Sequence, residues 1–260
     1  MIIVVIDGPD GVGKTTVATK VVNLLQRKKL KCIYQHFPFY SYPSGELIKR
    51  CLNGENGSFI NMNWRVSLAL YDIDRFLWIQ RNKNSLEKYV VITDRWSSSS
   101  FQYQTAQIVM QECPQIVKNL MNTYGYINKE LLKESVPISR YLEWLDTEHG
   151  KYGLQKSTIN FYLSLDQSLI YERINQRFEN ENSSPDQFES DDTFTYLVNA
   201  IGDYLSDNSY NKDNEDGYDS LYDNTEFVKI DANETPDLIA RKIVDYISNN
   251  LVITLDMIDC

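Results

Sequence analysis

The stretch GPDGVGKT, residues 8–15, decides the fold class, because it fits the pattern G-x-x-x-x-G-K-[ST] in full. A run of apolar, mostly β-branched residues precedes it at positions 2–6, and a helical pattern follows at positions 15–29. Glycines in such a turn allow backbone conformations that a Cβ would forbid. Successive N–H groups can then bind an anion at the N-terminus of the helix. The stretch therefore predicts a phosphate-binding loop between a buried strand and a helix.

The residue types in this loop suit a nucleoside triphosphate and its metal ion. Lys14 would reach the β- and γ-phosphates, and the Thr15 hydroxyl would ligate Mg²⁺. Lys14 is therefore a candidate catalytic residue, and Thr15 is a candidate metal ligand. The full set of predicted ATP-binding residues in the loop is Gly8, Asp10, Gly11, Val12, Gly13, Lys14, Thr15 and Thr16.

Strand and helix patterns alternate along the rest of the chain. Further strands are predicted at residues 31–35, 89–93, 158–165 and 226–230, and further helices at 43–52, 62–81, 97–112, 167–178 and 236–251. This alternation predicts an α/β fold with three α/β/α layers around a five-stranded parallel sheet. The chain reads as a single domain over residues 1–260, with insertions at about 113–140 and 207–224. The structure of the first insertion is left open.

The composition excludes several classes of function. The 260 residues are 42% hydrophobic, and the net charge is −10. Half of that charge comes from residues 207–224, which hold six acidic residues and one lysine and are expected to form a solvated loop. An acidic chain does not favour nucleic acid, since polyanion binding depends on Lys and Arg. No stretch approaches the ~20 apolar residues of a membrane span.

The cysteines do not form a metal-binding or disulfide pattern. They stand at positions 32, 51, 113 and 260, no two at a C-x-x-C spacing, and the only histidines are His36 and His149. The first residues are too short an apolar run for a signal peptide and have no basic start. The sequence therefore predicts a cytoplasmic protein with reduced thiols.

A second cluster of polar residues follows the buried strand pattern at residues 89–93. Asp94 ends this run, at the crevice where parallel sheets bind ligands, and could hold Mg²⁺ directly or through water. A lone Asp at this place is more often a helix N-cap. Arg95 beside it favours a site, because an Arg at a phosphate crevice can neutralise the transferred charge. Asp94 and Arg95 are therefore candidate catalytic residues, and Asp94 is a candidate metal ligand.

Several segments together resemble one family. Residues 94–104, DRWSSSSFQYQ, resemble the D-R-Y-x-x-S-x-x-A-Y-Q signature of thymidylate kinases. Residues 70–75, LYDIDR, resemble the L-F-A-A-D-R helix of that family, Phe37-Pro38 its F-P segment, and residues 227–232, FVKIDA, its last strand and turn. The matches fall in family order and cover most of the chain outside the two insertions. The resemblance implies a P-loop kinase fold with a helical lid, usually as a homodimer.

The activity implied by the resemblance is ATP- and Mg²⁺-dependent transfer of a γ-phosphoryl group to a deoxynucleoside monophosphate, with dTMP as the expected acceptor. Asp10 would accept the 3′-hydroxyl of the sugar, and Arg95 would hold the acceptor phosphate in line with ATP. Tyr103 would press against the 2′-carbon and disfavour ribose. Phe37, Tyr40, Ser99, Ser100 and Gln104 complete the sugar, phosphate and base contacts implied by the family.

Two residues on the 62–81 helix are implied to read the base. Tyr71 would stack on the pyrimidine, and Arg75 would donate to the 4-carbonyl and reject the 4-amino group of cytosine. Without the resemblance, Tyr71 could be a core aromatic, and Arg75 could pair with Asp72 or Asp74 on the surface. The substitutions around the base site, Ser100 above all, leave dUMP open as the acceptor.

The lid is expected at about residues 177–190, after the 167–178 helix, and should move to exclude water. Arg173 and Arg177 lie one helical turn apart and are candidates to clamp ATP phosphates, with a solvated basic face as the alternative. Some family members carry a catalytic Arg where Gly11 stands, and others carry one in the lid where Gln187 stands. The catalytic role would then fall on Arg177.

Two other functions stay open. A deoxynucleoside kinase shares the P-loop and the Arg-rich lid but usually has a carboxylate base after the second strand. Residues 36–40, HFPFY, offer no acid there, and the next is Glu46. A nucleotide-binding protein with decayed catalysis is the other alternative, and the absence of an Arg at Gln187 motivates it.

Overall fold

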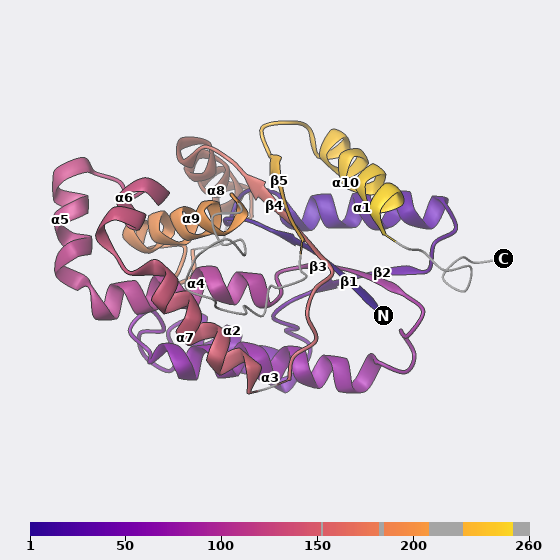
Figure 1. Cartoon of the computed structure of the whole chain (residues 1–260), viewed down its shortest axis with the longest axis horizontal. Coiled ribbons are helices and arrows are strands. Elements are labelled where there is room, and N and C mark those ends of the chain that lie inside the picture. The colour runs from indigo at the N-terminus through magenta and orange to yellow at the C-terminus, as the bar shows by residue number, and fades with distance from the viewer. Residues whose placement is uncertain (152, 182–184, 208–225, 252–260) are drawn as a thin grey trace.

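The apolar, β-branched runs form the centre of a five-stranded sheet. In the computed structural model, which describes residues 1–151, 153–181, 185–207 and 226–251, all neighbouring strands pair in parallel in the order β2–β3–β1–β4–β5 (Figure 1). The strands are β1 (Ile2–Asp7), β2 (Cys32–His36), β3 (Val90–Asp94), β4 (Ile159–Ser164) and β5 (Glu226–Asp231). Because both faces of the inner strands are covered, their side chains are buried throughout most of their length. The predicted five-stranded parallel sheet is confirmed.

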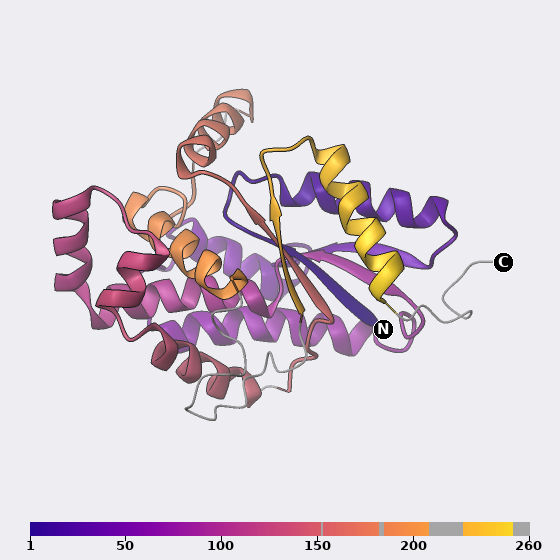
Figure 2. The ribbon, with the colours of Figure 1, turned by 45° about the horizontal axis from the view of Figure 1, so that its top comes forward.

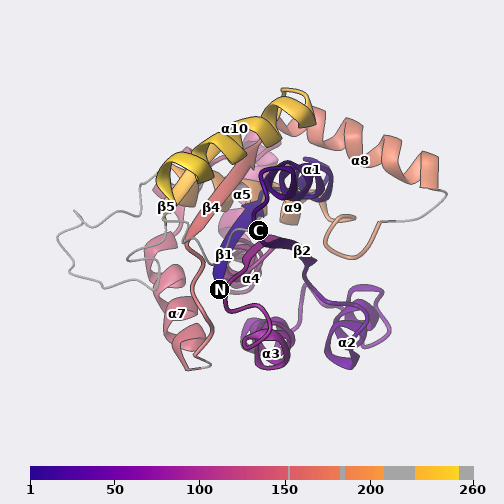
Figure 3. The same ribbon diagram turned by 90° about the vertical axis from the view of Figure 1, so that its right-hand side faces the viewer.

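Helices cover both faces of this sheet. They are α1 (Lys14–Arg27), α2 (Pro43–Leu52), α3 (Trp64–Asn82), α4 (Ser97–Glu112), α5 (Pro114–Tyr124), α6 (Lys129–Ser135), α7 (Ile138–Gly150), α8 (Gln167–Glu181), α9 (Asp192–Ser206) and α10 (Pro236–Asn250). Figure 3 shows α1 and α10 side by side above the strands, with α3, α4 and α7 below them. The three-layer architecture predicted from the sequence is confirmed.

A second core lies beyond the edge of the sheet. It joins apolar side chains from α2 to α7 and from α9. Helix α4 lies at its centre, with every residue from Ser98 to Val109 buried. Figure 2 shows this helical lobe at one end of the molecule and α8 standing out from the body. The predicted insertion at residues 113–140 therefore forms α5, α6 and the start of α7, which extend this core.

Two helices outside the first insertion were not predicted from the sequence, α7 for most of its length and α9. The N-cap of α9 is Asp191, whose side chain accepts a hydrogen bond from the N–H of Phe194. Apolar residues Phe194, Leu197, Val198 and Ile201 then follow at helical spacing. The signal for α9 was therefore present in the sequence.

Parts of two predicted segments lie outside the described residues: 208–224 of the acidic stretch and 182–184 of the lid. Within the described ranges, none of the helices combines the length and the apolar character that a membrane crossing requires.

The parallel arrangement also brings polar strand ends together. In the register of the sheet, Asp94 pairs with Ile6 of β1 on one side and with His36 of β2 on the other. Asp7, His36 and Asp94 therefore end their strands at one edge of the sheet, next to the loop that leads into α1.

Candidate active site

The loop between β1 and α1 has the geometry of a phosphate cradle. Gly8, Gly11 and Gly13 have φ angles of 139°, 80° and 92°, which disfavour any residue with a Cβ. A Cβ on Gly8 would lie 2.5 Å from the carbonyl oxygen of Leu163, and one on Gly11 would lie 2.7 Å from Cγ1 of Ile174. Gly13 is the N-cap of α1 and supplies no side chain there, so the first N–H groups of the helix face the loop.

The Lys14 side chain folds back onto the loop and contacts its first residues. Its Nζ donates to the carbonyls of Gly8 at 3.0 Å and Pro9 at 2.7 Å, and lies 3.2 Å from Oδ1 of Asp10. Burial lowers the pKa of Lys14, although Asp10 beside it acts in the opposite direction. The ammonium is therefore held at the mouth of the loop by carbonyl oxygens that a bound phosphate could replace.

Asp94 lies directly beside Thr15. The Thr15 hydroxyl donates to Oδ2 of Asp94 at 2.6 Å, Tyr34 donates to the same oxygen at 2.8 Å, and Nδ1 of His36 lies 2.6 Å from Oδ1. Burial raises the pKa of Asp94, but the contacts with His36, Thr15 and Tyr34 outweigh it, so the net shift is downward and the group is ionised. Trp96 is the N-cap of α4, so Asp94 does not cap that helix.

These oxygens suit a magnesium ion. Mg²⁺ binds a few protein oxygens and completes its shell with water and phosphate, and the Thr15 hydroxyl and the Asp94 carboxylate are of that kind. No cluster of three or more His, Cys, Asp or Glu side chains fit for a metal occurs in the part of the chain that the structure describes. Tyr34 and His36 were not predicted as site residues, although parallel pairing of β2 with β3 places His36 opposite Asp94.

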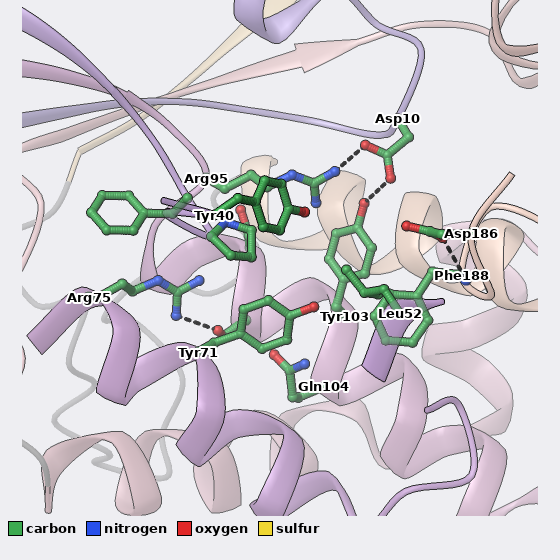
Figure 4. Close-up of a pocket in the computed structure, with 14 residues that line it drawn as sticks. Asp10, Tyr40, Leu52, Tyr71, Arg75, Arg95, Tyr103, Gln104, Asp186 and Phe188 are labelled. Carbon is green, nitrogen blue, oxygen red and sulfur yellow. Dashed lines mark hydrogen bonds and ion pairs between the residues drawn. The ribbon is translucent and has the colours of Figure 1, made fainter. Parts of the chain in front are cut away.

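A pocket of about 450 Å³, partly open to solvent, lies next to the loop (Figure 4). All ten predicted acceptor residues line it, and four residues that were not predicted, Pro38, Leu52, Asp186 and Phe188, line it as well. The lining residues are Asp10, Phe37, Pro38, Tyr40, Leu52, Tyr71, Arg75, Arg95, Ser99, Ser100, Tyr103, Gln104, Asp186 and Phe188.

One end of the pocket carries the charged groups nearest the P-loop. The Arg95 guanidinium and the Tyr103 hydroxyl, the latter at 2.7 Å, both donate to the Asp10 carboxylate. Burial raises the pKa of Asp10, but Arg95 and Lys14 opposite outweigh it and hold that pKa well below its usual value. Arg95 has a φ of 72°, a conformation that costs energy for a residue other than Gly and is common at functional sites.

The other end carries side chains that can read the edge of a base. Arg75 donates from Nη1 to Ser100 Oγ at 2.7 Å and lies 3.2 Å from Asp72. The pairing of Arg75 with Asp72 therefore occurs inside the protein rather than on the surface, since Arg75 is only 2% exposed. Gln104 donates to Ser67 at 3.1 Å, and its Oε1 has no hydrogen-bond partner among the described residues.

Ser99 has a different partner from Ser100. Its hydroxyl donates to the Asp7 carboxylate at 2.9 Å, as Ser98 does at 2.6 Å, and the Gly8 N–H donates to the same carboxylate. Asp7 therefore joins the start of the P-loop to the first turn of α4. Ser98 and Asp7 were not predicted, and the Ser97–Ser100 run begins a buried helix rather than forming a plain loop.

The two arginines predicted to clamp ATP phosphates have different partners. Arg173 donates to the carbonyl of Ala232 at 3.3 Å, and Arg177 donates to Glu189 at 2.6 Å. They therefore do not form one solvated basic face in this conformation. Arg177 lies one turn beyond Ile174, whose side chain lies next to Gly11 of the P-loop.

The lid segment after residue 185 is fastened to the body by Gln187. Its Oε1 accepts from the N–H of Phe59 at 2.8 Å, and its Nε2 donates to the carbonyls of Gly57 at 3.1 Å and Cys51 at 3.3 Å. Phe188 stacks on Phe59, with ring centroids 5.2 Å apart. Gln187 therefore holds the loop between α2 and α3 instead of supplying a cation to the phosphates.

Asp186 is the second acidic group that lines the pocket. Its pKa tests whether this carboxyl is buried near Glu189 and Asp10, as the structure places it. Burial and the nearby carboxylates of Glu189 and Asp10 raise its pKa from 3.8 to about 6. A carboxyl whose pKa is higher in the folded state than in the unfolded state lowers the free energy of unfolding at pH values above 6, where it is ionised in both states. This destabilisation disappears as the pH falls toward 3.8, because the carboxyl is then protonated in both states. We expect Asp186→Asn to raise the free energy of unfolding at pH 7.5 by about 1–3 kcal/mol and to leave it unchanged near pH 3.5.

Thermal melts of the wild type and the variant across this pH range would measure the difference. Asn keeps an oxygen that can accept from the N–H groups of Phe188 and Glu189, as Oδ1 of Asp186 does. Asp191→Asn serves as the matched control, because Asp191 is also an Asp that accepts a backbone hydrogen bond in this segment. A melting temperature of Asp186→Asn at or below that of the wild type at pH 7.5 would contradict the assignment.

Comparison with known families agrees with this geometry. Residues 6–123 match the family model described as thymidylate kinase. This part of the chain, a little under half of it, is therefore similar to thymidylate kinases in sequence. This region holds the P-loop, Asp94, Arg95 and the base-reading end of the pocket, whereas the lid arginines lie beyond it.

Two relatives extend the comparison. A thymidylate kinase of African swine fever virus (isolate Pig/Kenya/KEN-50/1950) is 29% identical over 147 residues, which is 55% of this chain and 59% of the viral protein. The match therefore spans less than two thirds of that thymidylate kinase. The solved structure of thymidylate kinase from Candida albicans superimposes with a TM-score of 0.62 at 19% identity, over 95% of this chain and 91% of that one. This likeness shows a shared fold over nearly the whole chain.

Proposed function

We propose that the chain transfers the γ-phosphoryl group of ATP, with Mg²⁺, to a deoxynucleoside monophosphate, and that dTMP is the preferred acceptor. The observation that carries this proposal is the position of the pocket. One end, at Arg95 and Asp10, adjoins Lys14 of the P-loop, and the other end holds base-reading groups (Figure 4). A monophosphate seated in it would present its phosphate to the P-loop.

The base-reading end is complementary to a 4-oxo pyrimidine. Arg75 offers N–H donors, which suit a carbonyl oxygen, and the unpaired Oε1 of Gln104 is an acceptor, which suits the N3–H of thymine or uracil. Cytosine has a donor and an acceptor at the opposite places, so it would leave buried groups unpaired. Tyr71 lines the same end with a ring on which a base can stack.

The chain's own residues divide the work of transfer. The Lys14 ammonium exchanges the carbonyls of Gly8 and Pro9 for the transferred phosphate. Arg95 orients the acceptor phosphate. Thr15 and Asp94 would hold Mg²⁺, which supplies charge neutralisation on the β- and γ-phosphates. Asp10 keeps Arg95 and Tyr103 in place and can accept the 3′-hydroxyl. Arg177 would add positive charge from the lid.

A panel of acceptors tests this function. We expect ADP release with ATP and Mg²⁺ in the order dTMP, dUMP and then dCMP, with products identified by mass. The missing methyl of dUMP removes about 0.8 kcal/mol of burial, which is roughly a fourfold loss, whereas dCMP should lose about 10²-fold or more. No turnover with any monophosphate would refute the proposal. Turnover of thymidine without dTMP would indicate a deoxynucleoside kinase instead.

We also propose that the chain forms a homodimer through α3. Four apolar side chains of this helix, Val66, Ile73, Phe76 and Leu77, are between 37% and 51% exposed, and large apolar residues gathered on one exposed face favour a partner surface. Sedimentation velocity should give a mass near twice 30.3 kDa. Ile73→Glu should shift the mass to that of the monomer, and the control Lys20→Ala on α1 should not. A monomeric wild type would contradict this proposal.

We further propose a cytoplasmic location, on the state of the thiols. Cys32 and Cys51 are buried, Cys113 is partly buried, and none of these three is part of a disulfide. Reduced thiols persist in reducing compartments. Fractionation of cells that express the tagged chain would test this location.

A further inference from the structure

The base-reading Arg75 is part of a buried polar triad. Its Nη1 lies 3.2 Å from Oδ1 of Asp72, and the other carboxylate oxygen of Asp72 lies 2.7 Å from Nδ1 of His149. None of the three side chains is more than 2% exposed. The carboxylate therefore lies between an arginine at the pocket and a histidine that does not line it. The contact with His149 has the distance of an ion pair but not the angles of a hydrogen bond.

The histidine comes from a part of the chain that the family match does not include. Asp72 and Arg75 lie one turn apart on α3, whereas His149 lies in the last turn of α7, beyond residues 6–123. Phe101 of α4 stacks on the His149 ring, with centroids 5.2 Å apart and an angle of 4° between the planes. The stacking on α4 therefore restricts the orientation of the ring, whose Nδ1 lies 2.7 Å from Asp72 of α3.

Asp72 is also a departure from the L-F-A-A-D-R pattern that residues 70–75 resemble, since it stands at the first Ala of that pattern. A buried carboxylate costs several kcal/mol to desolvate, and a buried ion pair seldom adds net stability over an apolar pair. Stability alone therefore gives no reason for a charged group here. What the triad does provide is a single orientation for the Arg75 guanidinium.

That orientation matters because Arg75 has several donors and only some face the pocket. Nη1 is occupied by Asp72 and by Ser100, the latter at 2.7 Å. Figure 4 shows the rest of the guanidinium extending into the pocket near Tyr40 and Tyr71. Because Nη1 is held by Asp72 and Ser100, the N–H groups that remain for a base carbonyl are also fixed.

We propose that His149, acting through Asp72, is a positioning residue that sets base selectivity by holding Arg75 in its donor orientation. The inference rests on the proposed function, in which Arg75 reads the 4-position of a pyrimidine. Without His149, Asp72 has one partner fewer, and the Asp72–Arg75 unit can rotate. A guanidinium that can rotate distinguishes a 4-carbonyl from a 4-amino group less well.

The test compares His149→Phe, His149→Gln and Asp72→Asn with the wild type. His149→Phe keeps an aromatic ring to stack on Phe101 and removes the nitrogen that faces Asp72. We expect it to raise the KM for dTMP about tenfold, with a change in kcat and in the KM for ATP of less than about twofold, and to reduce the dTMP over dCMP preference in kcat/KM by about tenfold. His149→Gln restores a donor and should recover much of the preference.

Leu145→Ala is the matched control, because Leu145 is fully buried on the same helix one turn from His149 and has no polar group. It should lower the melting temperature and leave the preference unchanged. If His149→Phe behaves like Leu145→Ala, with a lower melting temperature and the wild-type preference, the positioning role is wrong. If His149→Phe does not fold, Asp72→Asn takes its place in the test. A wild-type preference for dTMP over dCMP in Asp72→Asn would then show that the positioning role is wrong.

The two proposals can fail separately. Calorimetric binding of dTMP and dCMP by the wild type, measured beside turnover, decides between them. A wild type that prefers dTMP, together with variants that keep that preference, overturns the inference and leaves the proposed function intact. A wild type that binds or turns over both nucleotides equally overturns the assigned base reading and the role of His149 with it.

Discussion

Lys14→Ala is expected to lower kcat by about 10³-fold or more while the chain stays folded. Lys14 is the cation of the P-loop, and its Nζ already faces the carbonyls of Gly8 and Pro9 and the Asp10 carboxylate. The contact of Lys14 with the γ-phosphate should be stronger in the transition state than in the bound substrate. Removal of the lysine should therefore lower kcat rather than weaken substrate binding. ADP release under saturating ATP and acceptor would measure it.

The fold should survive this change because Asp10 keeps two other partners. Arg95 and Tyr103 still donate to its carboxylate, so no buried charge is left alone. Lys20→Ala is the matched control: Lys20 lies on the same helix and pairs with Asp237 on the surface at 2.8 Å. The control should keep both kcat and the melting temperature, and an unaffected kcat in Lys14→Ala would refute the role assigned to the P-loop lysine.

Features that depend on short stretches of chain could be predicted from the sequence. The P-loop was recognisable because its glycines, its lysine and its threonine stand within eight residues, with a strand before and a helix after. Asp94 and Arg95 were recognisable because they follow directly on a buried strand. The structure adds the reason that Gly11 cannot be an arginine here: a side chain there would collide with Ile174 of α8.

Features that depend on distant pairing could not be predicted. The buried positions of α7 follow a helical period, but two of them are Asp146 and His149, which are not expected on an apolar face. The structure shows that His149 is buried against Asp72 of α3. The contact partner of a buried polar residue lies on another element, so no local pattern reveals it.

The contacts of Gln187 in the predicted lid also depend on distant residues and could not be predicted from the sequence. Gln187 stands where the resemblance implies an arginine, and the sequence alone suggests only a lost cation. In the structure its amide joins this segment to Cys51 at the end of α2 and to Gly57 and Phe59 in the loop between α2 and α3. Gln187 therefore has a structural role in this conformation, and a phosphate clamp in the predicted lid would have to come from a different residue.

That residue should be Arg177, and Arg177→Ala is expected to lower kcat by about 10³-fold, with less than about a threefold change in the KM for the acceptor. Ile174, one turn earlier on α8, packs on Gly11, so the helix runs outward from the P-loop itself. Arg177 is paired with Glu189 in this conformation, at 2.6 Å. A lid closing on ATP would exchange that carboxylate for phosphate oxygens, whose charge is larger in the transition state.

Two further variants separate catalysis from lid stability. Glu189→Ala breaks the same ion pair but leaves the arginine, so it should keep most of kcat, because a partly exposed pair contributes only about 0–1 kcal/mol to stability. Arg173→Ala removes the neighbouring cation, which bonds the Ala232 carbonyl, and should raise the KM for ATP more than it lowers kcat. Equal losses of kcat in Arg177→Ala and Glu189→Ala would mean that the arginine only fastens the lid, and the charge for transfer would then have to come from Lys14 and Arg95 alone.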